Sequence, residues 1–355
     1  MMSKIQFEST ESRLTILEPS KEFAEGLHTV VIRKDPLLGD TSVYNPFLKD
    51  KARLFFGEND AELLRHLIES SGSTCFFCGE GVTKNTPKYP PALVPDGRLQ
   101  VGEAILFPNL FSIAKYHAIT ALSRAHFLAL SEFTPQLLFG GLSVNQEFLK
   151  AVYRDDQTIL FAIVCANYLF PAGASLVHPH MQTLVSPVSH SYHNRLMAAC
   201  KDYYQKEDSI YHEDLIAVEK DIGTRYIAQM GRWHWIAAFS PIGSNEVMAI
   251  HEHESDFAEL TMEDIGALSY GISRVLHCYG SLGYLSFNYA LYSSKKLARE
   301  EGQRSIIKII TRQNLYPNYR NDDYFLQKLL QSELIITLPE ELTLKMRRFF
   351  SPECT

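Results

Sequence analysis

The chain has 355 residues, of which 46% are hydrophobic and 21% are charged, the composition of an ordinary globular protein. Its net charge of -7 argues against a general binder of nucleic acid or of anionic membranes, because no excess of basic residues dominates the surface. The length suits one large domain or two halves.

No stretch has the features of a targeting segment or a membrane span. The first residues, MMSKIQFEST, lack the apolar core of a signal peptide. The most apolar stretch, residues 159–170, is too short to cross a bilayer. Six cysteines are spread along the chain, and only Cys75 and Cys78 lie close together. We therefore expect a cytoplasmic protein without a disulfide framework.

The first half of the chain predicts helices, loops and strands in turn. Residues 58–70 predict a polar helix, and the Pro- and Gly-rich residues 86–97 predict a surface loop. The alternating stretch 103–122 predicts two strands joined around residues 108–116. Residues 158–185, rich in β-branched and apolar side chains, predict one or two buried strands around a Pro-Ala-Gly turn.

Two segments of the chain begin a helix in the same way. Residues 126–139 and 255–268 each contain an aromatic residue, a polar turn and then a threonine suited to cap a helix, Thr134 or Thr261. A proline follows the first threonine, and Asp264 completes a capping-box-like pattern after the second. Both helices are expected to run about twenty residues into a β-rich segment. The pattern favours two copies of one α+β unit over a chance likeness of two helix starts.

The stretch GASLVHPHMQ, residues 173–182, carries groups suited to phosphoryl chemistry. On a strand, His178, His180 and Gln182 would project to one face, and Pro179 suits an edge strand. A neutral imidazole can attack phosphorus near neutral pH and form a covalent nucleotidyl-histidine. A neighbouring amide can donate to a phosphoryl oxygen. The alternative is a core strand that happens to contain two histidines.

The pair Cys75-Phe-Phe-Cys78 has the spacing of a zinc knuckle. Two further ligands are needed, and His126 and His178 are the candidates that would complete a Cys2His2 site. A redox pair is the alternative, and it is disfavoured because no strand–helix thioredoxin pattern surrounds the cysteines. Four protein ligands would make the site structural, with no open position for a catalytic water.

Taken together, these segments resemble the galactose-1-phosphate uridylyltransferase family, a branch of the histidine-triad superfamily. GASLVHPHMQ is similar to the family's active-site signature, and residues 33–39 resemble its N-terminal Arg-x-Asn-Pro-Leu-x-Gly motif. The cysteine pair matches the family's zinc cysteines. Residues 107–111 resemble the segment that wraps the nucleotide, and residues 123–126 fall where the family has its third zinc ligand. The resemblance covers roughly residues 30–190 well, with the motifs in the family's order.

The resemblance implies a role for each matching residue. His180 would be the nucleophile, and Gln182 would hold the transferring phosphoryl group. A nucleotide and phosphate pocket would be lined by Arg33, Asn109, Phe111, Asn167 and Ser175. One structural Zn2+ would be bound by Cys75, Cys78, His126 and His178.

The implied fold class is α+β, with a duplicated histidine-triad-like unit, antiparallel sheets with packed helices, and a degenerate second half. Residues 1–205 would be the nucleotide- and zinc-binding catalytic half. Residues 206–355 would be the degenerate half, which could bind the acceptor or form a dimer. The spacing from Thr134 to His180, added to Thr261, leads to residues 305–311, which contain no histidine. We therefore expect no second metal site.

The leading interpretation is a nucleotidyltransferase of the hexose-1-phosphate uridylyltransferase type, as in galactose metabolism. It would move UMP between a UDP-sugar and a sugar 1-phosphate through a nucleotidyl-histidine. One alternative is a phosphorylase of nucleotide sugars or dinucleoside polyphosphates, which residues 324–342 favour because they do not match the family's hexose contacts. The other is a non-catalytic, zinc-stabilised nucleotide-binding protein.

The expected partners are a nucleotide sugar or nucleotide, a phosphorylated acceptor and, as a possible homodimer, a second copy of the chain. Neither nucleic acid nor a membrane is expected to bind. The sequence leaves open whether the base is uracil or adenine, and whether the acceptor is a sugar phosphate or inorganic phosphate.

Overall fold

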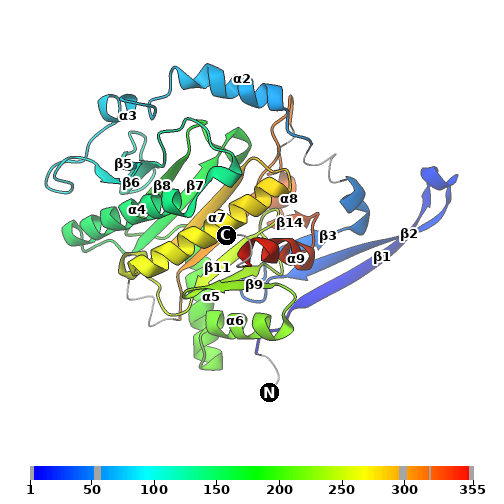
Figure 1. The fold of residues 1–355 in the computed structure, drawn as a ribbon. Coiled ribbons are helices and arrows are strands. Elements are labelled where there is room, and N and C mark those ends of the chain that lie inside the picture. Colours follow the sequence, from blue (N-terminus) through cyan, green and yellow to red (C-terminus); the bar gives the residue numbers. More distant parts are fainter. Residues whose placement is uncertain (1–3, 52–56, 296–301, 320, 352–355) are drawn as a thin grey trace.

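The computed structural model describes residues 4–51, 57–295, 302–319 and 321–351, and Figure 1 shows its fold. A ten-stranded sheet with helices on both faces forms the body of the molecule, and a four-stranded sheet lies beside it. Within these ranges, no helix combines the length and the apolar character that crossing a membrane requires.

The strands of the large sheet are, in chain order, β4 (Leu99–Val101), β5 (Ala104–Pro108), β6 (Tyr116–Ala121), β7 (Phe161–Tyr168), β8 (His180–Ser186), β9 (Tyr226–Met230), β10 (Trp233–Ala237), β11 (Val247–His251), β12 (Phe287–Ser294) and β13 (Ile306–Thr311). The small sheet contains β1 (Glu8–Glu18), β2 (Ala24–Lys34), β3 (Thr41–Tyr44) and β14 (Ser332–Ile335). The helices are α2 (Ala61–Gly72), α3 (Gly81–Lys84), α4 (Pro135–Asp155), α5 (Ser191–Glu207), α6 (Tyr211–Ile222), α7 (Met262–Ser281), α8 (Phe325–Lys328) and α9 (Pro339–Phe350).

The large sheet repeats one arrangement of strands twice. From its centre outward, the first half runs β7-β8-β6-β5-β4 and the second half runs β12-β13-β11-β10-β9. The two halves meet where β7 pairs with β12 in antiparallel register, from Phe161 opposite Ser294 to Tyr168 opposite Phe287. The predicted α+β fold with a duplicated unit is confirmed.

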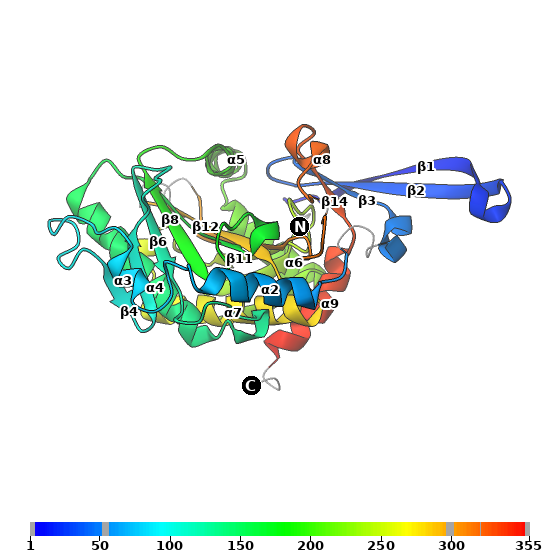
Figure 2. The same ribbon diagram turned by 90° about the horizontal axis from the view of Figure 1, so that it is seen from above.

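Helices α4 and α7 lie side by side on one face of this sheet (Figure 2). The side chains of Thr134 and Thr261 cap them, each accepting a hydrogen bond from the backbone N–H three residues later. The carboxylate of Asp264 accepts a hydrogen bond from the backbone N–H of Thr261, which completes a capping box. The two helix starts predicted from the sequence are confirmed.

The main hydrophobic core fills the space between α4, α7 and the sheet. Its largest fully buried side chains include Trp233, Trp235 and Phe148, and burying each contributes roughly 1.5–3 kcal/mol. The indole of Trp235 packs directly on the backbone of α7 at Gly271. A Cβ atom at this glycine would come within 2.0 Å of the indole ring. The close approach of α7 to the sheet therefore depends on Gly271.

We expect Gly271→Ala to destabilise the protein by about 1–3 kcal/mol, since the added methyl group must displace Trp235. The matched control is Gly266→Ala on the same helix, where an added Cβ meets nothing within 4 Å. That control should be neutral or stabilising by up to about 1 kcal/mol, because alanine favours the helix. Denaturant unfolding of both variants measures the difference. Equal stabilities would contradict the packing described here.

The opposite face of the second half is covered by α5 and α6. Leu196 and Cys200 of α5, with Leu215 of α6, form a second hydrophobic cluster against Ile250 and Ile306 of the sheet. On the same face the side chain of Lys308 of β13 is only 11% exposed and forms an ion pair of 2.7 Å with the buried Glu246. In Figure 2, α5 lies on the other side of the sheet from α4 and α7. This half therefore uses both faces of its sheet for packing.

The corresponding face of the first half is less covered. Met181 and Val185 of β8, and Val164 and Ala166 of β7, belong to the core on the α4 side. The intervening side chains therefore point to the opposite face. They include His180, Gln182, Cys165 and Asn167, of which the last three are half-buried. We call this surface the open face.

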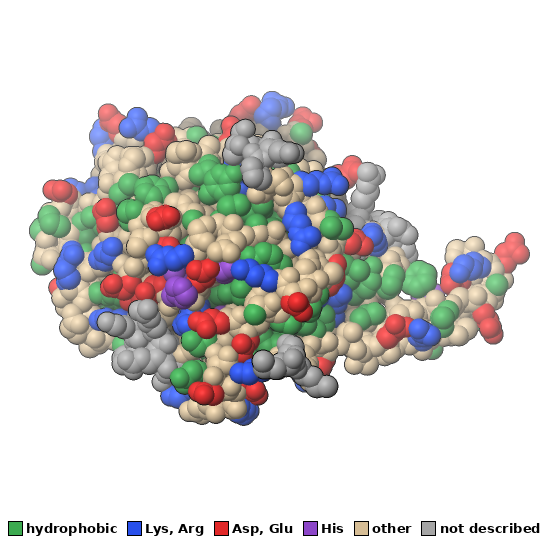
Figure 3. Space-filling model, turned by 60° about the horizontal axis from the view of Figure 1, so that its bottom comes forward, with side chains coloured by type: hydrophobic (Ala, Val, Ile, Leu, Met, Phe, Trp, Pro, Cys, Tyr) green, Lys and Arg blue, Asp and Glu red, His purple; other side chains and the backbone are tan. Residues whose placement is uncertain are grey.

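Strands β1 and β2 form a hairpin arm that projects from the body (Figures 1 and 2). Only residues 31–34 of β2 pair with β3, so the outer part of the arm has no third strand. Hydrophobic and charged side chains both lie on its surface (Figure 3), and Leu14, Leu17 and Phe23 are exposed. Because β14 pairs with β3, the small sheet joins residues from the predicted domains 1–205 and 206–355, and their boundary stays a prediction.

Candidate active site and metal cluster

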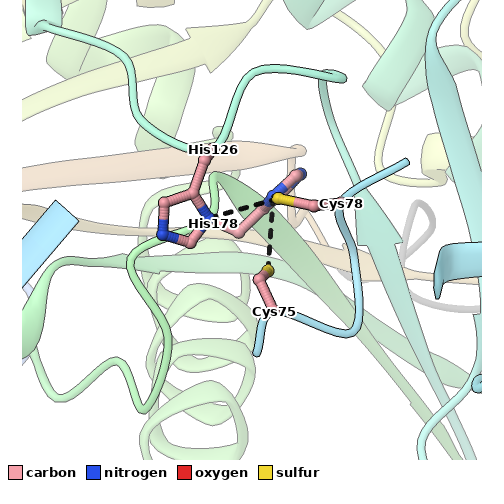
Figure 4. Close-up of side chains that lie close together, drawn as sticks. All are labelled: Cys75, Cys78, His126 and His178. Atoms are coloured by element: carbon pink, nitrogen blue, oxygen red, sulfur yellow. Dashed lines mark hydrogen bonds between the residues drawn. The ribbon is translucent and has the colours of Figure 1, made fainter. Parts of the chain in front are cut away.

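Four side chains that could bind a metal ion converge at one end of β8. Cys75 and Cys78 lie in the turn after α2, His126 follows β6, and His178 precedes β8. Their ligand atoms all lie within 4.8 Å of one another (Figure 4). The structure thus brings together the four residues predicted as zinc ligands.

The distances in the cluster fit a tetrahedral site. Cys78 Sγ lies 3.3 Å from His126 Nδ1 and 3.4 Å from His178 Nδ1, and Cys75 Sγ lies 3.7 Å from His178 Nδ1. Sulfur at about 2.3 Å and nitrogen at about 2.0 Å from one zinc ion would be roughly 3.5 Å apart. The donor set and its spacing therefore fit a metal of this kind.

Neighbouring groups orient both imidazoles toward the cluster. His178 Nε2 donates to the carbonyl of Ser123 at 2.8 Å. His126 Nε2 lies 2.9 Å from Ser71 Oγ, whose own hydrogen goes to the carbonyl of Leu67. Both Nε2 atoms therefore carry the proton, and both Nδ1 atoms keep a lone pair for a metal.

His180 begins β8 and is held as a neutral base. Its Nδ1 lies 2.8 Å from the carbonyl of His178, which can only accept, so Nδ1 carries the proton and Nε2 has a free lone pair. Burial lowers the pKa of His180 below its usual value of 6.5. The ring packs edge-on against Phe77, and 8% of the residue is exposed. This is the protonation state that a nitrogen nucleophile requires near neutral pH.

The structure differs from the sequence prediction at the start of this strand. His178 precedes β8, so the prediction of one strand carrying His178, His180 and Gln182 is wrong for His178. The prediction of an edge strand is wrong as well, because β8 lies between β6 and β7. Pro179 lies ahead of the strand, and its carbonyl accepts a hydrogen bond from the N–H of Leu122. Because Pro179 lies outside β8, its lack of a backbone N–H removes no hydrogen bond between β8 and the neighbouring strands.

Gln182 lies on the open face two residues after His180, and His117 of β6 holds its amide. The backbone N–H of Ile113 donates to His117 Nδ1, so the proton of this imidazole is on Nε2. Nε2 lies 2.9 Å from Gln182 Oε1 and donates to it. The carbonyl end of the Gln182 amide is thus occupied, and its NH2 group remains a donor for the open face.

Asn167 lies on the neighbouring strand, on the same face as His180 and Gln182. β7 pairs with β8 as far as Cys165 opposite Gln182, so Asn167, two residues further along β7, lies toward the end of β8 that carries His180. Its Oδ1 accepts a hydrogen bond of 2.7 Å from Asn288 Nδ2. His180, Gln182 and Asn167 therefore form a compact polar group on the open face.

The other predicted pocket residues lie at different distances from this group. Asn109 contacts His117, and Phe111 is 81% exposed on the loop that follows. Ser175 is exposed in the turn between β7 and β8. Arg33 lies on β2, where its guanidinium binds Glu340 through two hydrogen bonds of 3.1 Å and also donates to the carbonyl of Phe239. The structure does not bring Arg33 into the group around His180.

Sequence reasoning did not single out His117 or Asn288. Each is a polar residue near the start of a largely apolar strand, a pattern that core strands also show. Their partners, Gln182 and Asn167, lie 65 and 121 residues away in the chain. No local pattern signals either contact, and only the pairing of the strands reveals it.

Solved structures that share this fold include galactose-1-phosphate uridylyltransferase-like proteins. A GalT-like protein of Arabidopsis thaliana has a TM-score of 0.66 at 16% identity, over 89% of this chain and 98% of that chain. An ADP-glucose phosphorylase of Arabidopsis thaliana with bound ADP-glucose has a TM-score of 0.67 at 16% identity, over 90% and 98%. A uridylyltransferase mutant has a TM-score of 0.64 at 15% identity, over 91% and 98%. The resemblance noted in the sequence is confirmed at the level of the fold.

Among proteins compared by sequence, the chain is 30% identical over 325 residues to an uncharacterised protein of Archaeoglobus fulgidus. The alignment covers 91% of this chain and 93% of that protein. The chain belongs to the same family as this archaeal protein. No family model matches the chain.

Replacing one cysteine tests the metal cluster. We expect Cys75→Ser to lose the bound metal and to unfold at a lower temperature, because metal binding and folding are coupled at closed sites. Cys165→Ser is the control, since Cys165 lies on β7 outside the cluster. Elemental analysis of the purified proteins gives the metal content, and thermal unfolding gives the stability. A full metal complement in Cys75→Ser would mean that the ligand set is wrong.

Proposed function

We propose that the protein is a nucleotidyltransferase that works through a covalent nucleotidyl group on His180. The observation that carries this proposal is the state of His180, which is buried, neutral and bare at Nε2 beside two amides on an otherwise uncharged strand face. A histidine that only packs in a core does not need its proton fixed on Nδ1 and a free lone pair on Nε2.

In the first step, Nε2 of His180 would attack the α-phosphorus of a nucleoside-diphosphate sugar. The N–P bond forms as the bond from phosphorus to the leaving oxygen breaks, and the sugar phosphate leaves with that electron pair. The imidazole keeps its proton on Nδ1 and becomes positively charged. The carbonyl of His178, 2.8 Å from Nδ1, accepts that proton's hydrogen bond and stabilises the charge.

In the second step, an oxygen of the acceptor phosphate would attack the same phosphorus. The N–P bond breaks, and its electron pair returns to Nε2, which restores the starting state of His180. The NH2 groups of Gln182 and Asn167 would donate to the phosphoryl oxygens as charge shifts between them, without the cost of reorienting. Because both amides offer donors, the open face suits an anion rather than a cation.

We further propose that the cluster of Cys75, Cys78, His126 and His178 holds one structural zinc ion. Two thiolates and two imidazoles in a tetrahedral set are the donors that zinc prefers, and four protein ligands leave no open position for water. When bound, the ion would supply stability and fix the backbone of His178. The chemistry at phosphorus would be left to His180 and the amides.

The nucleotide would lie along the open face, with Asn109 and Phe111 near the base or ribose and Ser175 near the phosphates. Arg33 would act only if it exchanged Glu340 for a phosphate, so we propose no direct role for it. The leading reaction is transfer of UMP between a UDP-sugar and a sugar 1-phosphate. Transfer of a nucleotide to inorganic phosphate is the second candidate, since one of the proteins that share the fold is an ADP-glucose phosphorylase.

The first test is intact-protein mass spectrometry after mixing with UDP-glucose, ADP-glucose or a dinucleoside polyphosphate. We expect an adduct whose mass identifies the nucleotide, and we expect none with His180→Ala. Adding glucose 1-phosphate or inorganic phosphate to the isolated adduct then shows which acceptor removes it.

The control for this test is that His180→Ala stays folded and keeps its metal, because the side chain of His180 is not among the cluster's ligands. An adduct on the folded variant would place the nucleophile elsewhere. Nucleotide binding by the wild type without an adduct from any donor would favour the non-catalytic alternative.

The pH dependence of adduct formation provides a separate test. Nε2 is a nucleophile only when the imidazole is neutral, that is, above the pKa of His180. Because burial lowers this pKa from 6.5, the midpoint of the fall in rate should lie below pH 6.5. Rates measured between about pH 4 and pH 8 will locate the fall. A midpoint above 6.5 would contradict the buried, neutral state described here.

A further inference from the structure

A series of hydrogen bonds connects residues of the second half of the polypeptide to the candidate site. Asn288 of β12 lies opposite Asn167 of β7 in the sheet. Its Nδ2 donates to Asn167 Oδ1 at 2.7 Å and to the carbonyl of Ala172 at 2.9 Å. Its Oδ1 accepts from Arg312 Nη1 at 2.6 Å. Arg312 follows β13, so this contact begins in the half that carries no candidate nucleophile.

In each hydrogen bond of this series, the chemistry of the groups decides which one donates and which one accepts. A guanidinium can only donate and a backbone carbonyl can only accept, so the amide of Asn288 fits in one orientation between Arg312 and Ala172. Asp322 holds Arg312 in turn through two hydrogen bonds, from Nε at 2.9 Å and from Nη2 at 2.6 Å. The side chains of Arg312 and Asp322 are both less than one-fifth exposed. The direction of donation therefore runs from Arg312 to Asn167.

These hydrogen bonds set the orientation of the Asn167 side-chain amide. Its Oδ1 is occupied by the donor from Asn288, so its NH2 group is turned away from β12 and remains available to the group around His180. An asparagine that is free to rotate would offer its carbonyl oxygen to the same place for part of the time. A carbonyl oxygen repels a phosphoryl oxygen, whereas an NH2 group attracts it.

We propose that Asn288 and Arg312 are positioning residues that hold the Asn167 amide as a donor to the transferring phosphoryl group. The inference rests on the proposed function, since it assumes that a phosphoryl group binds beside His180. It assigns a role in the reaction to the degenerate half. That half would contact no substrate atom and would act through the orientation of one amide.

The decisive variant is Asn288→Asp, compared with Asn288→Ala. The new carboxylate keeps the shape of asparagine and the bond from Arg312, but it can no longer donate to Asn167. The Asn167 amide is then expected to turn over and present its carbonyl oxygen to the site. Alanine removes the constraint without reversing it, so that Asn167 presents its donor for part of the time.

The matched control is Asn321→Asp, which adds the same charge in the exposed loop beside Asp322. Asn321 Oδ1 already accepts a hydrogen bond from the N–H of Asp323, and aspartate can keep that bond. We expect this control to form the adduct at the wild-type rate, which separates an effect of local charge from an effect on Asn167.

Two quantities should be measured for each variant, the rate of adduct formation on His180 and the affinity for UMP and AMP. We expect Asn288→Asp to slow adduct formation by about 10²-fold or more, as for the loss of one donor in an oxyanion site. Its nucleotide affinity should change by less than about 10-fold, because a donor of this kind acts mainly in the transition state. Asn288→Ala should be intermediate in rate.

The order of the variants separates positioning from packing. If Asn288 only packs, alanine is the more damaging change, because it removes all the contacts of the side chain, and rate and affinity fall together with thermal stability. Two results would overturn this inference but not the proposed function, provided that the wild type forms the adduct. One is that Asn288→Ala forms the adduct as slowly as Asn288→Asp or more slowly. The other is that Asn288→Asp forms it at the wild-type rate. A wild type that binds UMP and AMP without an adduct from any donor, or that binds neither, would overturn the proposed function and this inference with it.

Discussion

The hydrogen bond from His180 Nδ1 to the carbonyl of His178 connects the two parts of the site. The side chain of His178 belongs to the metal cluster, while its backbone carbonyl sets the tautomer of the imidazole two residues later. The turn that contains Pro179 has to hold both groups at once. The chain around the cluster, from α2 to the loop after β6, in turn holds the imidazole of His178 in place. A disturbance of the cluster would therefore reach the reacting nitrogen through one peptide unit.

The two halves of the sheet share one architecture and differ in what covers them. In the second half, α5 and α6 lie on the face that remains open in the first half, and their apolar side chains pack against Ile250 and Ile306. A buried lysine–carboxylate pair, Lys308 and Glu246, lies on the same face. The second half still contributes β12 at the centre of the sheet. Its Asn288 donates a hydrogen bond to Asn167, which belongs to the polar group of the first half.

Much of this architecture follows from local sequence patterns. Thr134 and Thr261 cap helices because a threonine before an apolar, helix-spaced run satisfies free backbone donors, and this needs no knowledge of the rest of the chain. Spaced motifs similarly indicated the four ligands of the cluster, although three separate segments supply them. Helix caps and spaced motifs of this kind can be recognised in the sequence without knowledge of the fold.

Other features depend on pairing across the sheet and could not be derived from local patterns. The position of β8 between β6 and β7 is set by tertiary structure, and it overrode the edge strand that Pro179 suggested. The contacts of His117 and Asn288 join residues far apart in sequence. Arg33 matched a motif, yet the fold places its guanidinium against Glu340 on α9.

Because α5 and α6 cover one face of the second half of the sheet, the number of nucleotides that each polypeptide can bind covalently is limited. Within the described residues, only the first half combines a less covered face with a histidine at the start of a strand, so the proposed mechanism has one point of covalent attachment in each polypeptide. The amount of nucleotide retained in a burst should then equal the amount of chain, and not twice that amount, despite the doubled architecture. Any sigmoidal dependence on substrate concentration would then have to arise between chains, because the described part of a single chain holds no second equivalent site.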